Sequence, residues 1–318
     1  MISIKGLSKS FGPLKALDDL TLEIGPGEVF GFIGPNGAGK STTMKLLSCL
    51  ITPDSGTASV CGHDIQGDAG AIRRSVGYMP DFLGVYDDLT VDEYLQFFAA
   101  AFKIPRKQRA TIIGSVLELT DLVEKRHALV DSLSRGMQQR LGVARVLVHD
   151  PKVLLLDEPA SGLDPRARIE MRSLLLELGR MGKALMVSSH ILSELAEMCT
   201  SIGIIERGRL LYSGSIEDAY QRTRAMGGSQ GECVVVTLEA DSPPASTLEG
   251  ALAGDERIAA VKASDADRTL RVHLAAPGTS RHFIIERIAA AGGRIASFGI
   301  EEIKLEDAFL KLTTGALQ

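Results

Sequence analysis

The 318-residue sequence lacks the features that mark three large classes of protein. It has no basic excess, since 35 lysines and arginines stand against 40 aspartates and glutamates, so no nucleic-acid partner is expected. No apolar run approaches the roughly 20 residues that cross a bilayer. The first six residues lack the charged and then apolar segments of a signal peptide. We therefore expect a cytoplasmic protein, and a role at a membrane would require another polypeptide to cross it.

Signals for disulfides and structural metals are also missing. The four cysteines (Cys49, Cys61, Cys199 and Cys233) lie far apart, with no Cys-x-x-Cys pair and no histidine at metal-ligand spacing. We expect reduced, mostly buried thiols, as in a cytosolic protein.

What the sequence does contain is a series of short apolar runs that alternate with helical periodicity. Strands are predicted over residues 2–7, 17–24, 29–33, 57–60, 152–156, 184–188 and 202–206, and helices over residues 41–50, 165–181 and 191–199. This alternation predicts a largely parallel sheet covered on both faces, and ligands bind such sheets at the carboxyl ends of the strands. From about residue 88 to residue 150 the pattern is helical, at 91–102, 109–119 and 134–148, which predicts a helical insert.

The pattern changes again towards the end of the chain. Residues 221–230 are polar and glycine-rich, as expected of a linker between a first domain at 1–220 and a second at 231–318. Strands predicted at 233–238, 258–262, 269–274 and 294–299, with helices at 246–252 and 280–291, give the order βαββαβ before a closing helix at 305–312. This order predicts a small α+β domain of ferredoxin-like type.

The most specific local motif follows the predicted strand at residues 29–33. It consists of Gly34, Pro35, Asn36, Gly37, Ala38, Gly39, Lys40, Ser41 and Thr42, and it matches the phosphate-binding pattern G-x-x-x-x-G-K-[ST]. The glycines let backbone N–H groups approach phosphate oxygens at a helix N-terminus. Lys40 would reach the β- and γ-phosphates, and the Ser41 hydroxyl would bind Mg²⁺. The motif therefore predicts a nucleotide site.

A second motif follows four apolar residues at 153–156. Asp157 and Glu158 are adjacent, and adjacent side chains on a strand point to opposite faces, so the two carboxylates should have different roles. We expect Asp157 to hold Mg²⁺ through water and Glu158 to orient and deprotonate the attacking water. A solvated acidic turn at a strand end is the alternative.

Together these motifs resemble those of the ATP-binding cassette (ABC) ATPases, over residues 1 to about 220. The segment Leu133-Ser134-Arg135-Gly136-Met137 is similar to the family signature Leu-Ser-Gly-Gly-Gln, with the first glycine and the glutamine replaced. The resemblance implies a P-loop NTPase core with helical and antiparallel β subdomains, and two ATP molecules sandwiched in a homodimer or heterodimer. Ser134 and Gly136 would contact the γ-phosphate held by the other subunit, although Ser134 also suits a helix cap.

Four further positions take their expected roles from this resemblance. Phe11 would stack on adenine, with a strand-end core residue as the alternative. Asp164 would communicate between the two sites, with a capped turn as the alternative. His190, after a predicted strand, would contact the γ-phosphate and the catalytic water. Asp81 takes the place of a glutamine that senses Mg²⁺ and water and couples to the membrane subunit, and this shorter, charged side chain could bind the metal region more strongly.

The resemblance thus implies an ATPase subunit that powers a separate integral membrane permease from the inner face of the cell membrane. Residues 303–313 resemble the tail of family members that serve exporters, which favours export. The helical insert, near Asp81 and residues 86–88, would contact the permease. Two alternatives are a non-transport ABC ATPase acting on ribosomes or DNA, and a nucleotide-binding regulator with little turnover, prompted by Asp81 and Arg135.

Overall fold

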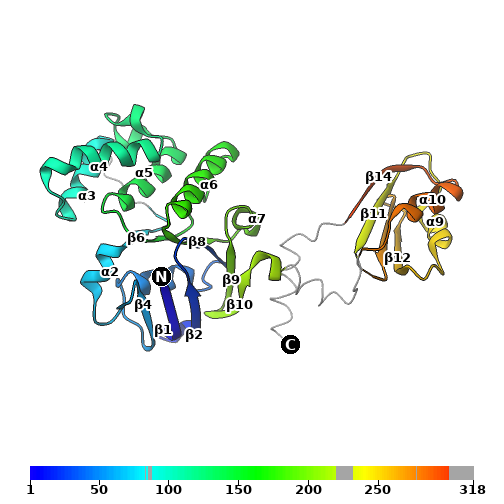
Figure 1. Cartoon of the computed structure of the whole chain (residues 1–318), viewed down its shortest axis with the longest axis horizontal. Coiled ribbons are helices and arrows are strands. Elements are labelled where there is room, and N and C mark those ends of the chain that lie inside the picture. Colours follow the sequence, from blue (N-terminus) through cyan, green and yellow to red (C-terminus); the bar gives the residue numbers. More distant parts are fainter. Residues whose placement is uncertain (83, 85–87, 220–231, 277, 301–318) are drawn as a thin grey trace. The chain divides into compact units, whose positions relative to one another are not determined.

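The computed structural model describes residues 1–82, 84, 88–219, 232–276 and 278–300. These residues form two units, the first from Met1 to Ile216 and the second beginning at Glu217 (Figure 1). The predicted linker at 221–230, the tail at 303–313 and the closing helix at 305–312 lie outside the described residues. Within the described residues, no helix combines the length and the apolar character needed to span a membrane.

The first unit contains an antiparallel sheet built from the N-terminal residues. Its order is β2-β1-β4-β5, with strands β1 (Ile2–Phe11), β2 (Leu14–Ile24), β4 (Ser55–Val60) and β5 (His63–Asp64). The turn between β1 and β2 contains Gly12 at φ 58°, in the left-handed region that favours glycine. Ile4 in β1 and Leu22 in β2 are buried, because successive side chains of a strand point to opposite faces and one face covers the core.

A second sheet, mostly parallel, carries the phosphate-binding loop. Its order is β10-β9-β3-β8-β7-β6, with strands β3 (Val29–Ile33), β6 (Val76–Met79), β7 (Val153–Leu156), β8 (Ala184–Ser189), β9 (Ser201–Glu206) and β10 (Arg209–Ser215). β10 pairs antiparallel with β9, and the other pairings are parallel. All residues of β3 and β7 are buried, as expected of strands covered on both faces. The segments that follow the parallel strands therefore lie at one edge of the sheet.

The helices of the first unit fall into two groups. Those associated with the sheets are α1 (Lys40–Leu47), α2 (Ala69–Ser75), α6 (Pro165–Arg180) and α7 (Leu192–Ala196). The middle block contains α3 (Val91–Ala101), α4 (Arg106–Leu119) and α5 (Arg135–Leu147), with 3₁₀ turns at Val123–Lys125 and Val130–Ser132. This helical block is inserted between β6 and β7, which are neighbours in the sheet.

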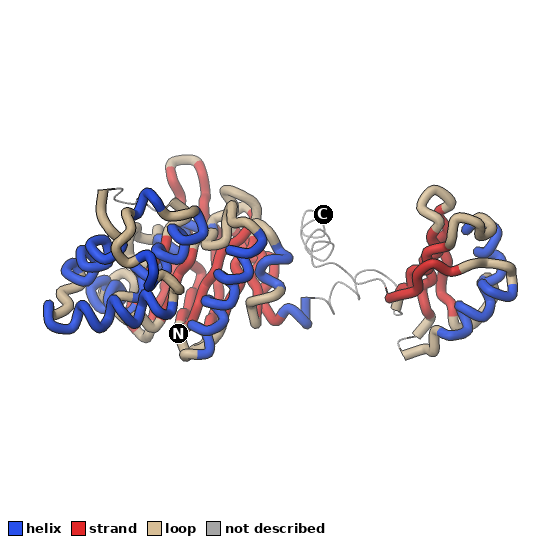
Figure 2. Tube along the Cα trace, turned by 90° about the horizontal axis from the view of Figure 1, so that it is seen from above, coloured by secondary structure: helices blue, strands red, loops and turns tan. Residues whose placement is uncertain are grey.

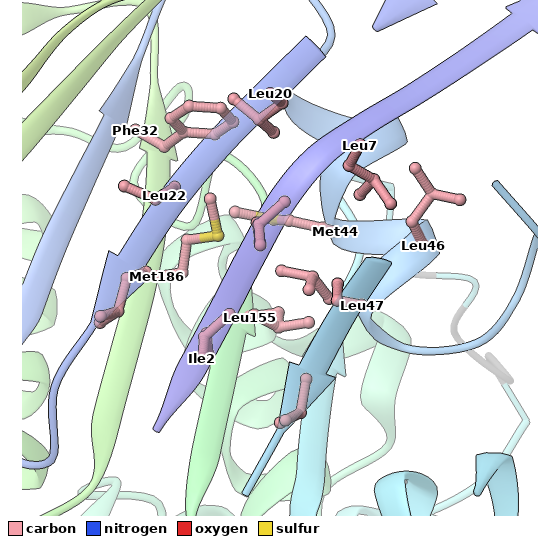
Figure 3. Close-up of a cluster of buried hydrophobic side chains, with 14 of the residues drawn as sticks. Ile2, Leu7, Leu20, Leu22, Phe32, Met44, Leu46, Leu47, Leu155 and Met186 are labelled. Carbon is pink, nitrogen blue, oxygen red and sulfur yellow. The ribbon is translucent and has the colours of Figure 1, made fainter. Parts of the chain in front are cut away.

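A hydrophobic core lies between the two sheets and α1 (Figure 3). It contains Ile2, Leu7, Leu20 and Leu22 from the antiparallel sheet, Met44, Leu46 and Leu47 from α1, and Phe32, Leu155 and Met186 from the parallel sheet. Burying one such side chain contributes about 1.5–3 kcal/mol. This packing holds α1 against both sheets and so fixes the position of its first residue, Lys40.

The second unit has the predicted order βαββαβ. Its elements are β11 (Cys233–Leu238), α9 (Ala245–Leu252), β12 (Ile258–Ser264), β13 (Thr269–Leu274), α10 (His282–Ala290) and β14 (Ile295–Ile300). The sheet order is β12-β13-β11-β14, and every pairing is antiparallel. Both helices cover one face of the sheet (Figure 2), where Val236, Val272 and Ile284 are buried.

Some short elements differ from those predicted. α7 ends at Ala196, whereas a helix was expected to continue to residue 199. The chain turns there because Thr200 N–H donates to Val29 O, which starts β9 beside β3. The sequence patterns did not predict β6, β10 or α2. β6 has four residues and includes Gly77, where a Cβ would lie 2.9 Å from the Leu154 side chain.

Candidate nucleotide site

The loop after β3 packs so closely that two of its glycines cannot be replaced without movement. A Cβ at Gly34 would lie 2.2 Å from the carbonyl oxygen of Ile205, and one at Gly39 would lie 2.6 Å from a backbone carbonyl oxygen of β2. Gly39 also has φ 114°, which an L side chain rarely adopts. Residues 35–37 form the exposed tip, whereas residues 38–40 are buried. The tip of the loop is therefore accessible to a ligand, whereas its last residues are packed into the core where α1 begins.

Lys40 begins α1 and points back into this loop. Its side chain is 6% exposed, and Nζ donates a 2.6 Å hydrogen bond to the Gly34 carbonyl oxygen. The same Nζ lies 3.4 Å from Glu158 Oε1. Ser41 and Thr42 follow in the first turn, where a helix has free backbone N–H groups. An ammonium group and a helix N-terminus thus converge, which suits a chain of phosphates.

The two carboxylates after β7 make different contacts, in line with the expectation for adjacent residues. Asp157 is 2% exposed, and its Oδ1 accepts a 2.7 Å hydrogen bond from Ser188 Oγ on β8. Ser188 Oγ in turn accepts a 2.9 Å hydrogen bond from the backbone N–H of Glu158. Glu158 has φ 51°, an unfavourable conformation for this residue type. Neighbouring strands therefore fix both carboxylates at the sheet edge.

Glu158 lies between two of the predicted catalytic residues. Its Oε2 is 2.9 Å from His190 Nδ1, and its Oε1 is 3.4 Å from Lys40 Nζ. Within the described residues, the buried Oε1 has no hydrogen-bond partner of good geometry. His190 follows β8, and its side chain is 44% exposed. Glu158 thus contacts both Lys40 and His190, and its Oε1 remains available as an acceptor.

Asp81 lies close to the same carboxylates. It follows β6, which pairs with β7, and its side chain is exposed. Desolvation raises the pKa of Asp81, and the negative charges of Asp157 and Glu158 raise it further. The positive charges of Arg135 and His190 lower the pKa of the same carboxyl group. The segments that follow β6 and β7 therefore carry three acidic side chains.

The signature-like segment begins α5. Ser134 is exposed and caps the helix, because its Oγ accepts a 3.3 Å hydrogen bond from Met137 N–H. Gly136 lies against α6, since a Cβ there would be 2.9 Å from the Ala167 Cβ. Among the described residues, no hydrogen bond or ion pair joins Ser134 or Gly136 to the phosphate-binding loop of the same chain.

For Asp164 and Phe11 the sequence left a purely structural role open as an alternative, and the structure bears on each. Asp164 caps α6, with Oδ1 accepting a 2.9 Å hydrogen bond from Ala167 N–H, so the alternative of a capped turn is confirmed. Phe11 ends β1 and is 48% exposed, with Lys9 Nζ 5.7 Å from the ring centroid. The alternative of a core residue is therefore wrong for Phe11, whose ring is accessible for stacking.

The sequence patterns did not indicate the role of Ser188 or the contact that Arg135 makes. Ser188 bridges the side chain of Asp157 and the backbone of Glu158, and its only signal in the sequence is a hydroxyl at the end of a predicted strand. Arg135 lies against Gly162, where a Cβ would be 2.3 Å from the Arg135 Cζ. No local pattern indicates that contact, because it joins the starts of two different helices.

The ligand atoms at this site suit Mg²⁺ bound together with phosphates. They do not suit a metal ion that protein side chains hold by themselves. The described residues contain no group of three or more His, Cys, Asp or Glu side chains arranged for a metal. Mg²⁺ is usually bound by one or two carboxylates, with phosphates and water as the other ligands. The buried carboxylate of Asp157 and the hydroxyl of Ser41 are donors of that kind, beside a loop suited to phosphates.

Comparisons with known proteins agree with this geometry. The family model described as ABC transporter matches residues 17–161. The Nod factor export ATP-binding protein I of Ralstonia nicotianae is 38% identical over 245 residues, which cover 77% of this chain and 74% of that protein. The protein of the same name from Burkholderia lata is 34% identical over 319 residues, covering 100% of this chain and 98% of that one.

A solved structure extends the likeness to three dimensions. The dimeric structure of a post-hydrolysis state of the ATP-binding cassette MJ0796, bound to ADP and Pi, is 25% identical with a TM-score of 0.62, and the match covers 68% of this chain and 99% of that chain. The phosphate-binding loop, the acidic pair and the signature-like segment all lie within residues 17–161, which the family model matches. The chain belongs to the ABC transporter family, as an ATP-binding subunit that hydrolyses ATP.

Proposed function

We propose that this chain hydrolyses ATP in a head-to-tail dimer and thereby drives export through a permease formed by another polypeptide. The observation that carries the proposal is the contact of Glu158 with both Lys40 and His190 at the edge of the parallel sheet. Lys40 is the group that neutralises the β- and γ-phosphates. Glu158 is the general base, because its Oε1 is buried beside Lys40 and has no good hydrogen-bond partner among the described residues. His190 orients Glu158 through Oε2.

Ser41 and Asp157 are the residues that would hold Mg²⁺, with Asp81 nearby. When bound, this ion would neutralise charge on the β- and γ-phosphate oxygens. Ser188 holds Asp157 in one orientation through its 2.7 Å hydrogen bond, so the carboxylate is ordered before a metal arrives. Phe11 supplies an exposed ring at the end of β1 for stacking on adenine.

The proposal of a composite site rests on the exposed start of α5. Ser134, Gly136 and the first-turn N–H groups form an anion-attracting end without a partner in the phosphate-binding loop of the same chain. The likeness to a dimeric cassette supports pairing of two chains, in which each supplies Ser134 and Gly136 to the γ-phosphate held by the other. Asp164, which caps α6 beside this segment, would carry changes between the two sites.

The proposal of export rests on similarity to export proteins. Relatives named Nod factor export ATP-binding protein I match this chain, one of them over its whole length. The chain would therefore act from the cytoplasmic face of the membrane, attached through its permease.

A groove of about 460 Å³ is the proposed contact surface for that permease. Phe98 and Phe102 give it an apolar wall, and Arg73 and Arg145 add positive charge. Burial, together with the negative charges of Asp157 and Asp81, raises the pKa of Tyr78 in the groove to about 12. The groove is lined by residues of β6 and by residues of the helical insert. Residues 86 and 87, also expected to contact the permease, lie outside the described residues, whereas Asp88 is exposed.

The Glu158→Gln variant tests the hydrolytic role. We expect ATP binding to persist and phosphate release to fall more than about a hundredfold, since the amide cannot accept the proton of the attacking water. Glu170→Gln is the matched control, because Glu170 lies on α6 and pairs with Arg166 and Arg140. Ordinary ATPase rates in Glu158→Gln would contradict the general-base assignment. A wild-type chain without saturable, Mg²⁺-dependent hydrolysis would favour the regulator instead.

A further inference from the structure

The start of α5 packs against the segment that follows Glu158 in the same chain. Arg135 is the first residue of α5, and its guanidinium lies over Gly162. Cζ and the two terminal nitrogens of Arg135 are 2.3, 2.4 and 2.5 Å from the position that a Cβ would take at Gly162. These distances are nearly equal, so the flat face of the guanidinium covers the glycine. Gly162 also has φ 67°, so both the backbone conformation and the space require glycine here.

A second close contact joins the same two segments. Gly136 follows Arg135 on α5, and a Cβ there would lie 2.9 Å from Ala167 Cβ on α6. Ala167 N–H donates to Asp164 Oδ1, which caps α6. The starts of α5 and α6 therefore meet through small residues, and Arg135 extends this contact from α6 to the loop before it.

The loop that Arg135 covers begins at the proposed general base. Ser161 N–H donates a 3.1 Å hydrogen bond to the Glu158 carbonyl oxygen, which closes a turn. Glu158 has φ 51°, an unfavourable conformation that persists only where the surrounding structure holds it. Gly162 comes directly after this turn. A side chain packed on Gly162 therefore restrains the backbone that carries the Glu158 carboxylate.

We infer that Arg135 is a positioning residue for the catalytic loop of its own chain, residues 158–164. The residues on either side of Arg135 are proposed to serve the nucleotide held by the other subunit, so one short segment would contribute to both sites of a dimer. The planar guanidinium acts by packing on Gly162, which keeps the Glu158 carboxylate aligned with the attacking water. This inference rests on the proposed hydrolysis in a dimer and adds a contact within one chain to it.

Purified mixed dimers show in which site Arg135 acts. Two affinity tags allow isolation of dimers in which one chain carries Lys40→Ala, so that a single site stays active, and the reference dimer pairs this chain with wild type. Arg135→Gly in the chain with intact Lys40 removes the contact beside the working Glu158. We expect kcat to fall about tenfold, because a small misplacement of reacting groups is costly. Arg135→Gly in the Lys40→Ala chain should leave kcat within about twofold of the reference.

Binding measurements show whether the effect is one of position. The KM for ATP and the equilibrium affinity for the non-hydrolysable analogue AMP-PNP with Mg²⁺ should match the reference in both Arg135→Gly dimers, because Lys40 is intact at the remaining site. Unchanged binding also shows that the variant chains are folded.

Three results would overturn the inference. If kcat falls when Arg135→Gly is in the Lys40→Ala chain, Arg135 acts on the nucleotide of the other subunit. If the AMP-PNP affinity falls, the residue serves binding rather than alignment of Glu158. If neither dimer is slower than the reference, the contact has no part in turnover.

Substitutions at both ends of the contact test its nature. Gly162→Ala would place a methyl group where the guanidinium lies, so it should slow the chain as Arg135→Gly does. Gly182→Ala is the matched control, because Gly182 has φ 86° but no atom within 4 Å of an added Cβ. Arg135→Lys keeps the charge and loses the planar group, so it should recover little of the lost rate. Full recovery with lysine would overturn packing as the cause.

Homodimers give an independent measurement. Arg135→Gly and Gly162→Ala remove the same contact, so the double variant should hydrolyse ATP about as fast as the slower single variant. Losses that multiply would contradict the inference. An inactive reference dimer, by contrast, would count against the proposed function, in which a mixed dimer keeps one working site. The homodimer cycle then still decides whether the two residues act through one contact.

Discussion

The N-termini of α1 and α5 are alike in construction and different in surroundings. Each helix follows a loop, and each has first-turn backbone N–H groups that attract anions. At α1, Lys40 is buried, donates to the Gly34 carbonyl and lies near Glu158. At α5, Ser134 is exposed and Oγ accepts a long hydrogen bond of 3.3 Å from Met137. One end is completed by residues of its own chain, and the other faces outwards.

The two helix N-termini are therefore expected to contribute to ATP hydrolysis in different ways. The α1 end has a cation, two carboxylates and a histidine within reach, so it can hold phosphates and move a proton. As far as the structure describes it, the α5 end offers a hydroxyl and backbone donors, with no acidic residue in its first turn. Such an end can stabilise charge on a phosphate but cannot start hydrolysis. We therefore expect the two ends to respond differently to mutation.

The largest effect is expected at α1. Lys40→Ala removes the ammonium that lies beside Glu158, and ATPase turnover should fall by about a thousandfold, because the charge on the phosphates is no longer neutralised. Lys45→Ala on the same helix is the control, since Lys45 is exposed in the last turn. Phosphate release at saturating ATP measures both variants. Similar ATPase rates in Lys40→Ala and Lys45→Ala would contradict a special role for the N-terminus of α1.

Mixing experiments sharpen the comparison at α5. Ser134→Glu should abolish turnover by placing a carboxylate against the partner's phosphate. An equal mixture of Ser134→Glu and Lys40→Ala chains should recover about a quarter of wild-type activity. Half of the dimers are then mixed, and each mixed dimer keeps one site in which both Lys40 and Ser134 are intact. Thr90→Glu, which changes the cap of α3 instead, should stay active alone. No recovery on mixing would mean that Ser134 acts within its own chain.

The smallest effect concerns the other end of α5. His149 follows this helix, stacks on Phe102 at 3.8 Å and donates through Nε2 to the Val76 carbonyl. Burial lowers the pKa of His149, so the folded state favours the neutral ring. The resulting stability is present above the unfolded pKa of about 6.5 and is lost as the pH falls through the lower folded value.

The measurement is the Tm at pH 7.5 and at pH 5.5. Wild type should lose more stability between these values than His149→Gln, whose amide keeps a donor for Val76 without titrating in this range. An equal loss in both proteins would assign the pH dependence to other groups.

The motifs name most residues of the proposed site, whereas the contacts between motifs depend on the fold. Lys40 and Glu158 were named from a loop pattern and a strand end, and His190 from the family resemblance, and the parallel sheet brings them together. Ser188 was missed, because a serine at a strand end has no distinctive pattern until the neighbouring strand is known. The elements not predicted, such as β6, are short and depend on pairing with β7. Their residues carry too little periodicity to indicate a strand.

The sequence by itself determined the chemistry of each local segment. A glycine-rich loop, a lysine and a hydroxyl are consecutive from Gly34 to Ser41, so their backbone geometry follows from local sterics. Only the tertiary structure decided which segments meet. Parallel strands end at one edge and bring Glu158 to Lys40, and two helix starts pack closely enough to lay Arg135 on Gly162. These contacts join distant residues, and long-range packing rather than local preference sets them.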